Sequence, residues 1–154
     1  MNILFQKWMN GIFIIIFFKD MAQYFEINRN ATLPSLRLEV INDGRNDFGK
    51  LYLALQGSSS VTFTMTNTAT GIKKIAKAKA YVVYDEDSDC EERYFIEYRW
   101  KKRDTNESGT YTGHFHIDFQ SPVYMEGVTF PQGELIVPIA EDLIILVNDS
   151  MIKK

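Results

Sequence analysis

Side chains along much of this chain alternate between apolar and polar, and this two-residue period is what most limits the fold. The clearest runs have their apolar side at Leu36, Leu38 and Val40, at Val61, Phe63 and Met65, at Tyr94, Ile96, Tyr98 and Trp100, and at Tyr111, Phe115, Ile117 and Phe119. Successive side chains of a β-strand point to opposite faces of a sheet, so each run gives a strand with one packed face and one solvated face. The pattern therefore predicts a protein made of β-strands.

Clusters of turn-forming residues separate these runs. They include Asn42-Asp43-Gly44, Gln56–Ser60, Asp104–Gly109 and Pro131-Gln132-Gly133. Several short strands with turn clusters between them are typical of a β-sandwich or a β-barrel, and 154 residues suit one domain. One segment is ambiguous, because the Lys–Ala alternation of Thr70–Ala80 fits a strand as well as a helix. We predict a single all-β sandwich domain over residues 21–154.

Residues 1–20 differ from the rest of the chain and form an extra apolar segment. The run Gly11–Phe18 is shorter than the roughly 20 apolar residues of a transmembrane helix. No good cleavage site for a secretory signal follows it. Because Met21 opens an ordinary soluble sequence, we favour translation from Met21, with residues 1–20 as upstream sequence. A signal-like segment or membrane anchor is the second interpretation, and a packing role is the third.

The segment Gly109-Thr110-Tyr111-Thr112-Gly113 opens a predicted strand just after a polar loop. A tyrosine in this position can donate its hydroxyl to a backbone carbonyl of the loop, as in the tyrosine corner of immunoglobulin-like folds. The alternative is an ordinary half-buried aromatic residue. Gly109 would allow a tight turn, and Gly113 would allow a close approach between strands or a bulge.

Several short motifs occur in a definite order along the chain. They are Thr32-Leu33-Pro34, Val61-Thr62-Phe63, Tyr98-Arg99-Trp100, Asp104-Thr105, Gly109-Thr110-Tyr111-Thr112-Gly113-His114-Phe115, Thr129-Phe130-Pro131 and Leu135-Ile136-Val137. In this order and spacing they resemble the N-terminal immunoglobulin-like domain of phage upper baseplate proteins, the BppU type, from about Tyr24 to about Val147. The resemblance implies an immunoglobulin-like antiparallel β-sandwich. Such proteins continue beyond this domain into receptor-binding parts, whereas this chain stops there. The resemblance therefore implies a short adaptor.

This resemblance implies a non-enzymatic structural protein of the phage virion, an adaptor of the tail or baseplate type. Its partners would be other virion proteins and further copies of itself, assembled in the host cytoplasm. Two alternatives stay open. One is a capsid-associated protein that decorates the head or anchors head fibres, and the other is a secreted immunoglobulin-like module that binds carbohydrate or cell surfaces.

Candidate contact residues for such an adaptor are apolar side chains in turns and near the C-terminus. They are Phe48, Tyr124 and Met125, and, in the hydrophobic tail 143–147, Leu143, Ile144 and Ile145. Ordinary loop or core packing is the alternative for all six, and for the tail it is at least as strong.

Two patterns resemble metal sites. His114 and His116 lie two apart on a predicted strand and so share a face, but the chain has no third histidine to complete a site. Asp85, Asp87 and Asp89 resemble the start of a calcium loop. That loop needs glycine where Cys90 stands and glutamate where Ile96 stands. We therefore predict no metal and no cofactor, with both histidines as solvated polar residues.

Nothing in the residue inventory indicates an enzyme. Cys90 is the only cysteine and lies in the acidic stretch Asp85–Glu92, which disfavours its thiolate. The sequence has neither a glycine-rich phosphate loop nor a nucleophile elbow, so we predict no catalytic residue. The net charge is −3, and the nearest approach to a basic cluster is the short run Arg99–Arg103. A solvated hairpin tip explains this run better than nucleic-acid binding. Membrane contact would depend on residues 1–20 alone.

Overall fold

The computed structural model describes residues 3–9, 12–18, 22–39, 59–86, 92–119, 122–125, 128–130, 132–138 and 141–149. Every regular element among them is a β-strand, as the two-residue period predicts. None of these residues belongs to a helix long and apolar enough to cross a membrane.

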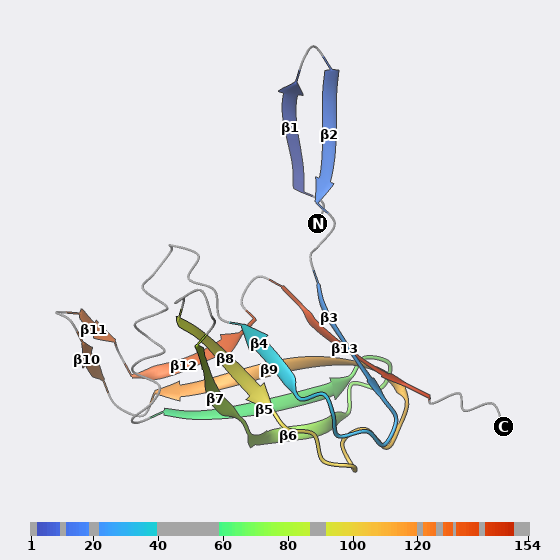
Figure 1. The fold of residues 1–154 in the computed structure, drawn as a ribbon, viewed down its shortest axis with the longest axis vertical. Helices are drawn as coiled ribbons and strands as arrows, with labels where there is room; N and C mark the ends of the chain where they lie inside the picture. Colours follow the sequence, from blue (N-terminus) through green and yellow to red (C-terminus); the bar gives the residue numbers. More distant parts are fainter. Residues whose placement is uncertain are drawn as a thin grey trace.

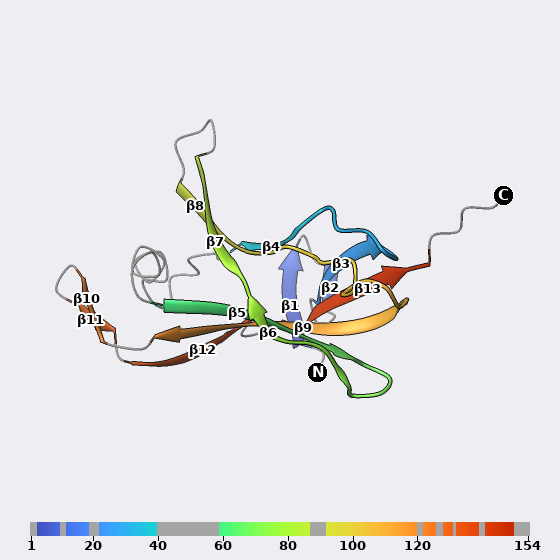
Figure 2. The same cartoon turned by 90° about the horizontal axis from the view of Figure 1, so that it is seen from below.

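Two sheets stack to form a β-sandwich (Figures 1 and 2). The larger sheet has the order β3 (Gln23–Asn28), β13 (Leu143–Asn148), β9 (Gly109–Phe119), β5 (Ser59–Asn67) and β6 (Lys73–Lys79), and β12 (Gly133–Val137) also pairs with β9. The smaller sheet has the order β4 (Leu36–Glu39), β8 (Glu92–Tyr98) and β7 (Tyr81–Glu86). All pairings in both sheets are antiparallel except that of β13 with β3, which is parallel. Figure 2 shows β4, β8 and β7 above the larger sheet.

Two further strand pairs complete the described chain. Strands β10 (Val123–Met125) and β11 (Val128–Phe130) form one antiparallel pair. Strands β1 (Ile3–Met9) and β2 (Ile12–Phe18) form the other, with Ile3 opposite Phe18. The interpretation of residues 1–20 as upstream sequence stays a prediction.

The four clearest alternating runs become strands β4, β5, β8 and β9, which confirms those predictions. On β9 the odd-numbered side chains from Tyr111 to Phe119 are buried and the even-numbered ones are half-buried or exposed. The ambiguous segment Thr70–Ala80 contains strand β6 and no helix.

The core lies between the two sheets and is centred on an aromatic cluster. Phe63 of β5 is fully buried. Its ring centroid lies 4.6 Å from that of Tyr98, 4.8 Å from that of Phe115 and 6.0 Å from that of Trp100. Because Tyr98 belongs to β8 and Phe115 to β9, this one side chain joins the two sheets.

Of the two alternatives for Tyr111, the structure shows the one in which its hydroxyl bonds back to the loop. The Tyr111 hydroxyl donates a hydrogen bond to the Glu107 carbonyl oxygen at 3.0 Å, and the side chain is 1% exposed. A buried hydroxyl needs such a partner, because an unsatisfied one costs about 1–3 kcal/mol. The bond fixes how the loop enters β9.

Gly113 lets core side chains lie close to the backbone of β9, where the sequence predicts a close approach between strands or a bulge. A Cβ atom added there would lie 2.8 Å from Cδ1 of Ile145 and 3.0 Å from Cε2 of Phe63. Both distances are shorter than ordinary carbon–carbon contacts of about 3.5–4.0 Å. Glycine at this position therefore lets Phe63 and Ile145 pack directly against the strand.

Replacing Gly113 by alanine should lower the free energy of unfolding by about 1–3 kcal/mol, the usual cost of an overpacked core. Gly133 is the matched control, because a Cβ added there meets nothing within 4 Å. Gly133→Ala should leave stability unchanged or slightly raised. Chemical denaturation measures the stability of both variants. If Gly113→Ala were as stable as Gly133→Ala, the close packing of Phe63 and Ile145 against Gly113 would be contradicted.

A β-bulge interrupts the pairing of β6 with β5 in the larger sheet. Phe63 pairs with Ala78 and Met65 with Ile75, so two residues of β6 stand opposite Thr64 alone. Lys77 lies in the bulge with a φ of 46°, and its backbone nitrogen donates to the Thr64 hydroxyl at 3.2 Å. Bulges bend a strand and increase its twist. The bend directs the chain from β6 in one sheet to β7 in the other.

Candidate functional site

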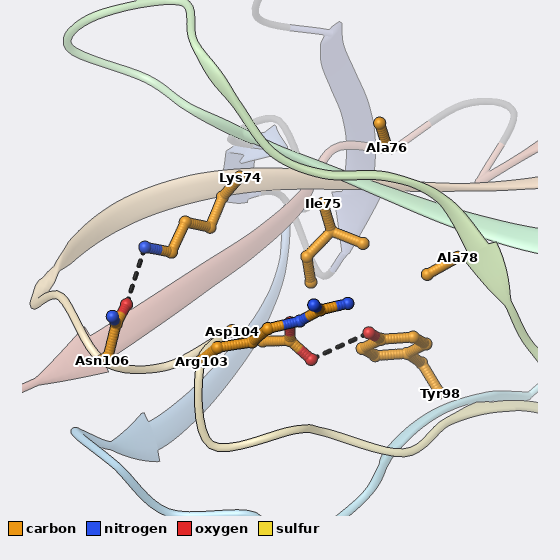
Figure 3. Close-up of a pocket in the computed structure, with 8 residues that line it drawn as sticks. All are labelled: Lys74, Ile75, Ala76, Ala78, Tyr98, Arg103, Asp104 and Asn106. Carbon is orange, nitrogen blue, oxygen red and sulfur yellow. Dashed lines mark hydrogen bonds and ion pairs between the residues drawn. The ribbon is translucent and has the colours of Figure 1, made fainter.

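Strand β6 and the loop after β8 lie side by side on one open side of the sandwich. Lys74 Nζ donates to Asn106 Oδ1 at 2.7 Å and to Glu107 Oε1 at 2.9 Å. Figure 3 shows Lys74 reaching across to Asn106. Two segments about 30 residues apart in sequence thus form one surface.

A pocket of about 400 Å³ lies between these segments. Its volume is near the lower end of the roughly 300–1,000 Å³ of small-molecule sites. The pocket is lined by Lys74, Ile75, Ala76 and Ala78 of β6 and by Tyr98, Arg103, Asp104 and Asn106. In Figure 3 the side chain of Arg103 lies between Ile75 and the Tyr98–Asp104 pair. The pocket therefore presents a guanidinium and an ammonium group together with one carboxylate.

A buried hydrogen-bond network holds the loop that forms one wall. Asp104 Oδ2 accepts the Tyr98 hydroxyl at 2.9 Å and the Lys101 backbone N–H at 2.8 Å. Thr105 donates its hydroxyl to the Ala31 carbonyl at 2.8 Å. The Asp104-Thr105 motif is therefore a structural element of the loop, with both residues buried. Burial, together with the hydrogen bond to Asp104, raises the pKa of Tyr98 well above its ordinary value of 10.

Tyr81 begins β7 (Tyr81–Glu86), and two cations lie near its ring. Lys79 Nζ lies 5.4 Å and Arg99 Cζ 4.8 Å from the ring centroid. These distances fit cation–π contacts, which form within about 6 Å. Lys79 belongs to the end of β6 and Arg99 follows β8, so Tyr81 connects the two segments a second time.

Glu97, next to Arg99, is buried although the alternation predicts it on the solvated face. Its carboxylate accepts the Ser35 hydroxyl at 2.6 Å and pairs with Arg37 at 3.5 Å and Arg99 at 3.3 Å. These three side chains cover it, which the alternation of a single strand cannot reveal. The hydrogen bond from Ser35 lowers the pKa of Glu97; both arginines act in the same direction and burial opposes them.

Glu97→Gln should reduce the free energy of unfolding near pH 7 by about 1–2 kcal/mol, because charge-assisted hydrogen bonds become neutral ones. The lowered pKa means that the unfolded state binds more protons near and below the ordinary value of 4.5. The wild type should therefore have a higher free energy of unfolding than the variant above that pH. This difference should disappear as the pH falls through the pKa of folded Glu97. Denaturation titrations between about pH 7 and pH 3 test this sign, with exposed Glu26→Gln as the control. A difference in stability between wild type and Glu97→Gln that does not change with pH would contradict the lowered pKa.

We use the name basic face for the two adjoining segments 73–79 and 99–107, whose cations are mostly exposed. It comprises Lys73, Lys74, Lys77 and Lys79 on β6 and Arg99, Lys101, Lys102 and Arg103 after β8. Seven of these side chains are exposed, and Lys74 is half-buried. Residues 73–79 and 99–107 hold these eight cations and two carboxylates, so their net charge is +6 in a chain of −3. The face can attract and orient an acidic partner.

His114 and His116, which the sequence predicts as solvated polar residues, lie on the outer face of β9 in half-buried positions. His116 Nδ1 lies 2.8 Å from Glu134 Oε1, which already gives it a partner. Within the described ranges no group of three or more His, Cys, Asp or Glu could hold a metal ion. Asp87 and Asp89, from the loop that resembles a calcium site, lie outside those ranges.

The structure places the predicted contact residues in different environments. Leu143 and Ile145 are buried at 4% and 0% exposure, because β13 lies inside the larger sheet between β3 and β9. This corrects their prediction as contact residues and supports the core-packing alternative. Ile144 alternates with them and is half-buried on the opposite face. Tyr124 and Met125 belong to β10, and Phe48 lies outside the described residues, so their contact role stays a prediction.

The sequence analysis does not predict the basic face, because it assigns the run Arg99–Arg103 to a solvated hairpin tip. The run Arg99–Arg103 was visible as a short cluster, whereas the lysines of β6 appeared as one polar side of an ambiguous segment. A signal that could have joined them is their shared composition, because residues 73–79 and 99–107 each contain four cations. Their proximity depends on long-range strand pairing, which the sequence does not display.

No protein-family model matches this chain, and neither the curated proteins nor the solved structures include a significant match to it.

Proposed function

We propose that this chain is a non-enzymatic assembly module with an immunoglobulin-like β-sandwich fold, an adaptor of the tail or baseplate type in a phage virion. Its basic face would bind an acidic surface of a neighbouring virion protein. Two separate features support the two parts of this proposal, the fold type and the binding role.

The tyrosine corner supports the immunoglobulin-like assignment. Tyr111 bonds to a carbonyl four residues upstream at the start of β9, as in the tyrosine corners of such sandwiches. The motifs that carry the resemblance to phage baseplate domains also serve the fold: Tyr98 bonds to Asp104 and Thr105 bonds to Ala31. Residues with these buried bonds build a scaffold, which suits an adaptor.

The single observation that carries the binding role is the basic face. A net charge of +6 is concentrated in 16 residues of a chain whose total is −3. Like charges close together oppose one another unless a partner neutralises them. Complementary charges across an interface speed association and select the partner. A face of this kind therefore suits protein assembly.

Particle composition tests this function. Virions are purified by density gradient from a host that carries the gene, and the chain is quantified by mass spectrometry in separated heads and tails. We expect its peptides with tails, in a fixed ratio to the other tail proteins. Recovery with heads would favour the capsid-associated alternative. Recovery only outside the particles would contradict a virion role.

A further inference from the structure

We infer that the pocket between β6 and the loop after β8 receives one aspartate or glutamate side chain of the acidic partner, with Arg103 as its main binding group and Lys74 as a second cation. This inference deepens the proposed function and rests on it, because it takes the partner of the basic face to be an acidic protein surface. It adds that binding depends on the shape of one pocket as well as on the charge of the whole face.

The pocket has room for a side chain because alanines form part of its wall. Its volume is about 400 Å³, and Ala76 and Ala78 of β6 line it. Figure 3 shows both alanines on β6 and Arg103 on the loop that faces them. Ala76 is exposed and Ala78 is half-buried. An alanine side chain ends at Cβ, so a larger residue at either position would occupy space that is now open.

The guanidinium group of Arg103 has the right shape to bind a carboxylate. The side chain is 79% exposed, and its ion-pair partner among the described residues is Asp104, whose Oδ1 lies 3.8 Å from Arg103 Nε. Charge-assisted N–H···O bonds measure about 2.7–2.9 Å, so this ion pair contains no close hydrogen bond. The forked N–H groups of an arginine match the two oxygens of a carboxylate and bind them with two parallel hydrogen bonds. An incoming aspartate or glutamate would gain both bonds.

Asp104 is held inside the loop and leaves the pocket open to a second carboxylate. It is 4% exposed, and its Oδ2 accepts the Tyr98 hydroxyl at 2.9 Å and the Lys101 backbone N–H at 2.8 Å. Both donors therefore stabilise its charge within the protein. The same bonds fix the backbone from which Arg103 extends. A site that is already ordered before binding loses less conformational entropy when the ligand arrives.

Lys74 supplies a second cation at the pocket. Its Nζ donates to Asn106 Oδ1 at 2.7 Å and to Glu107 Oε1 at 2.9 Å, and the side chain is 18% exposed. These contacts hold the ammonium group in place. An ammonium group has three N–H donors, so one remains for a ligand. Because Glu107 offsets part of the charge of Lys74, Arg103 is the stronger of the two groups.

A protein carboxylate fits this pocket better than a nucleic acid does. Single-stranded nucleic acids bind basic grooves by stacking their bases on aromatic side chains. The aromatic ring among the described lining residues is that of Tyr98, which is 2% exposed and so offers no face for stacking. A carboxylate on a flexible side chain needs only the cations and the space beside them.

Binding of a labelled hexaglutamate peptide, measured by fluorescence anisotropy, tests the charge part of the inference. We expect Arg103→Ala to weaken binding about tenfold or more, because hydrogen bonds between charged groups are strong. Lys102→Ala removes the same charge from an exposed residue that does not line the pocket, and it should weaken binding no more than about threefold. Arg103→Lys keeps the charge but loses the fork, so its affinity should lie between those of the two alanine variants.

A second pair of variants tests the shape of the pocket without changing any charge. Ala78→Leu fills part of the pocket and should reduce peptide binding to the level of Arg103→Ala. Ala69→Leu is the control, because Ala69 is exposed and does not line the pocket, and it should bind like the wild type. Thermal unfolding first establishes that each variant folds. Where Ala78→Leu does not fold, Ala76→Leu at an exposed lining position takes its place.

Two patterns of peptide binding would overturn the inference. One is equal weakening by Arg103→Ala and Lys102→Ala with unchanged binding by the pocket-filling variant, which would leave the basic face as a binding surface without a pocket. The other is no binding of the peptide by the wild type. Tighter binding of hexathymidylate than of hexaglutamate would also overturn it, because the pocket would then prefer phosphate. Particle composition is measured separately, so the virion role and the pocket can fail independently.

Discussion

Replacing Phe63 by alanine should lower the free energy of unfolding by about 3–5 kcal/mol, the typical cost of removing a buried aromatic side chain. Phe63 is fully buried and contacts aromatic rings of both sheets, at 4.6 Å to Tyr98 and 4.8 Å to Phe115. The truncation leaves a cavity where the sheets meet, and it also removes the aromatic contacts. Equilibrium denaturation of the purified variant measures the loss.

Tyr24→Ala provides the control for Phe63→Ala. Tyr24 is an aromatic residue on edge strand β3 and is 68% exposed. Its removal should cost less than about 1 kcal/mol, within the range of strand propensities. Where Phe63→Ala does not fold, Phe63→Leu keeps part of the volume and should show an intermediate loss. A cost at Phe63 no larger than that at Tyr24 would mean that the core is not centred on this residue.

Asp104→Ala should be the second most damaging change, with an expected loss of about 3 kcal/mol. The carboxylate accepts two hydrogen bonds, from Tyr98 and from the backbone of Lys101, and the residue is 4% exposed. Removing it leaves two donors without a partner, and each unsatisfied buried group costs about 1–3 kcal/mol. The loop that carries half of the basic face would also lose its anchor.

A double-mutant cycle separates the two bonds of Asp104. In a Tyr98→Phe background one donor is already absent, so Asp104→Ala should cost about 1–2 kcal/mol less than in the wild type. Additive losses would show that the two side chains do not interact in solution.

Measuring stability at alkaline pH tests the environment of Tyr98, the donor of the hydrogen bond to Asp104. Burial raises the pKa of Tyr98 above the ordinary value of 10, so above that pH the unfolded state binds fewer protons than the folded state. The contribution of Tyr98 to stability is therefore complete below pH 10 and is lost as the pH rises. Tyr98→Phe should show a flatter loss of stability than the wild type in this range.

Local pattern predicts four of the strands of the sandwich because alternation is a property of each strand alone. It identifies the buried faces of β4, β5, β8 and β9 before any pairing is known. It fails for Leu143 and Ile145, because their burial depends on β13 pairing with β3 about 120 residues away and with β9 about 30 residues away. It fails for Glu97 as well, because Ser35 and Arg37 reach it from outside its own strand.

The candidate site was harder to predict than the fold. The four lysines of β6 serve equally well as a solvated strand edge, and lysines are common there because they discourage edge-to-edge pairing. Only the bulge at Lys77, the contacts of Lys74 with Asn106 and Glu107, and the stacking on Tyr81 join them to Arg99–Arg103. These are tertiary contacts, so no local pattern reports them.

Incorporation into particles is the most direct test of the basic face as the assembly surface. The wild type, the Lys79→Glu/Lys102→Glu face variant and the Lys153→Glu/Lys154→Glu control, which has the same change of net charge, are expressed in turn in a phage that lacks its own copy, and purified particles are analysed by quantitative mass spectrometry. The thermal unfolding of each purified protein first establishes that all three fold. We expect the wild type and the control in particles at equal levels and the face variant at no more than about a tenth of that level, corresponding to about 1.4 kcal/mol of lost binding. Incorporation of the folded face variant at the wild-type level would contradict the role assigned to the basic face.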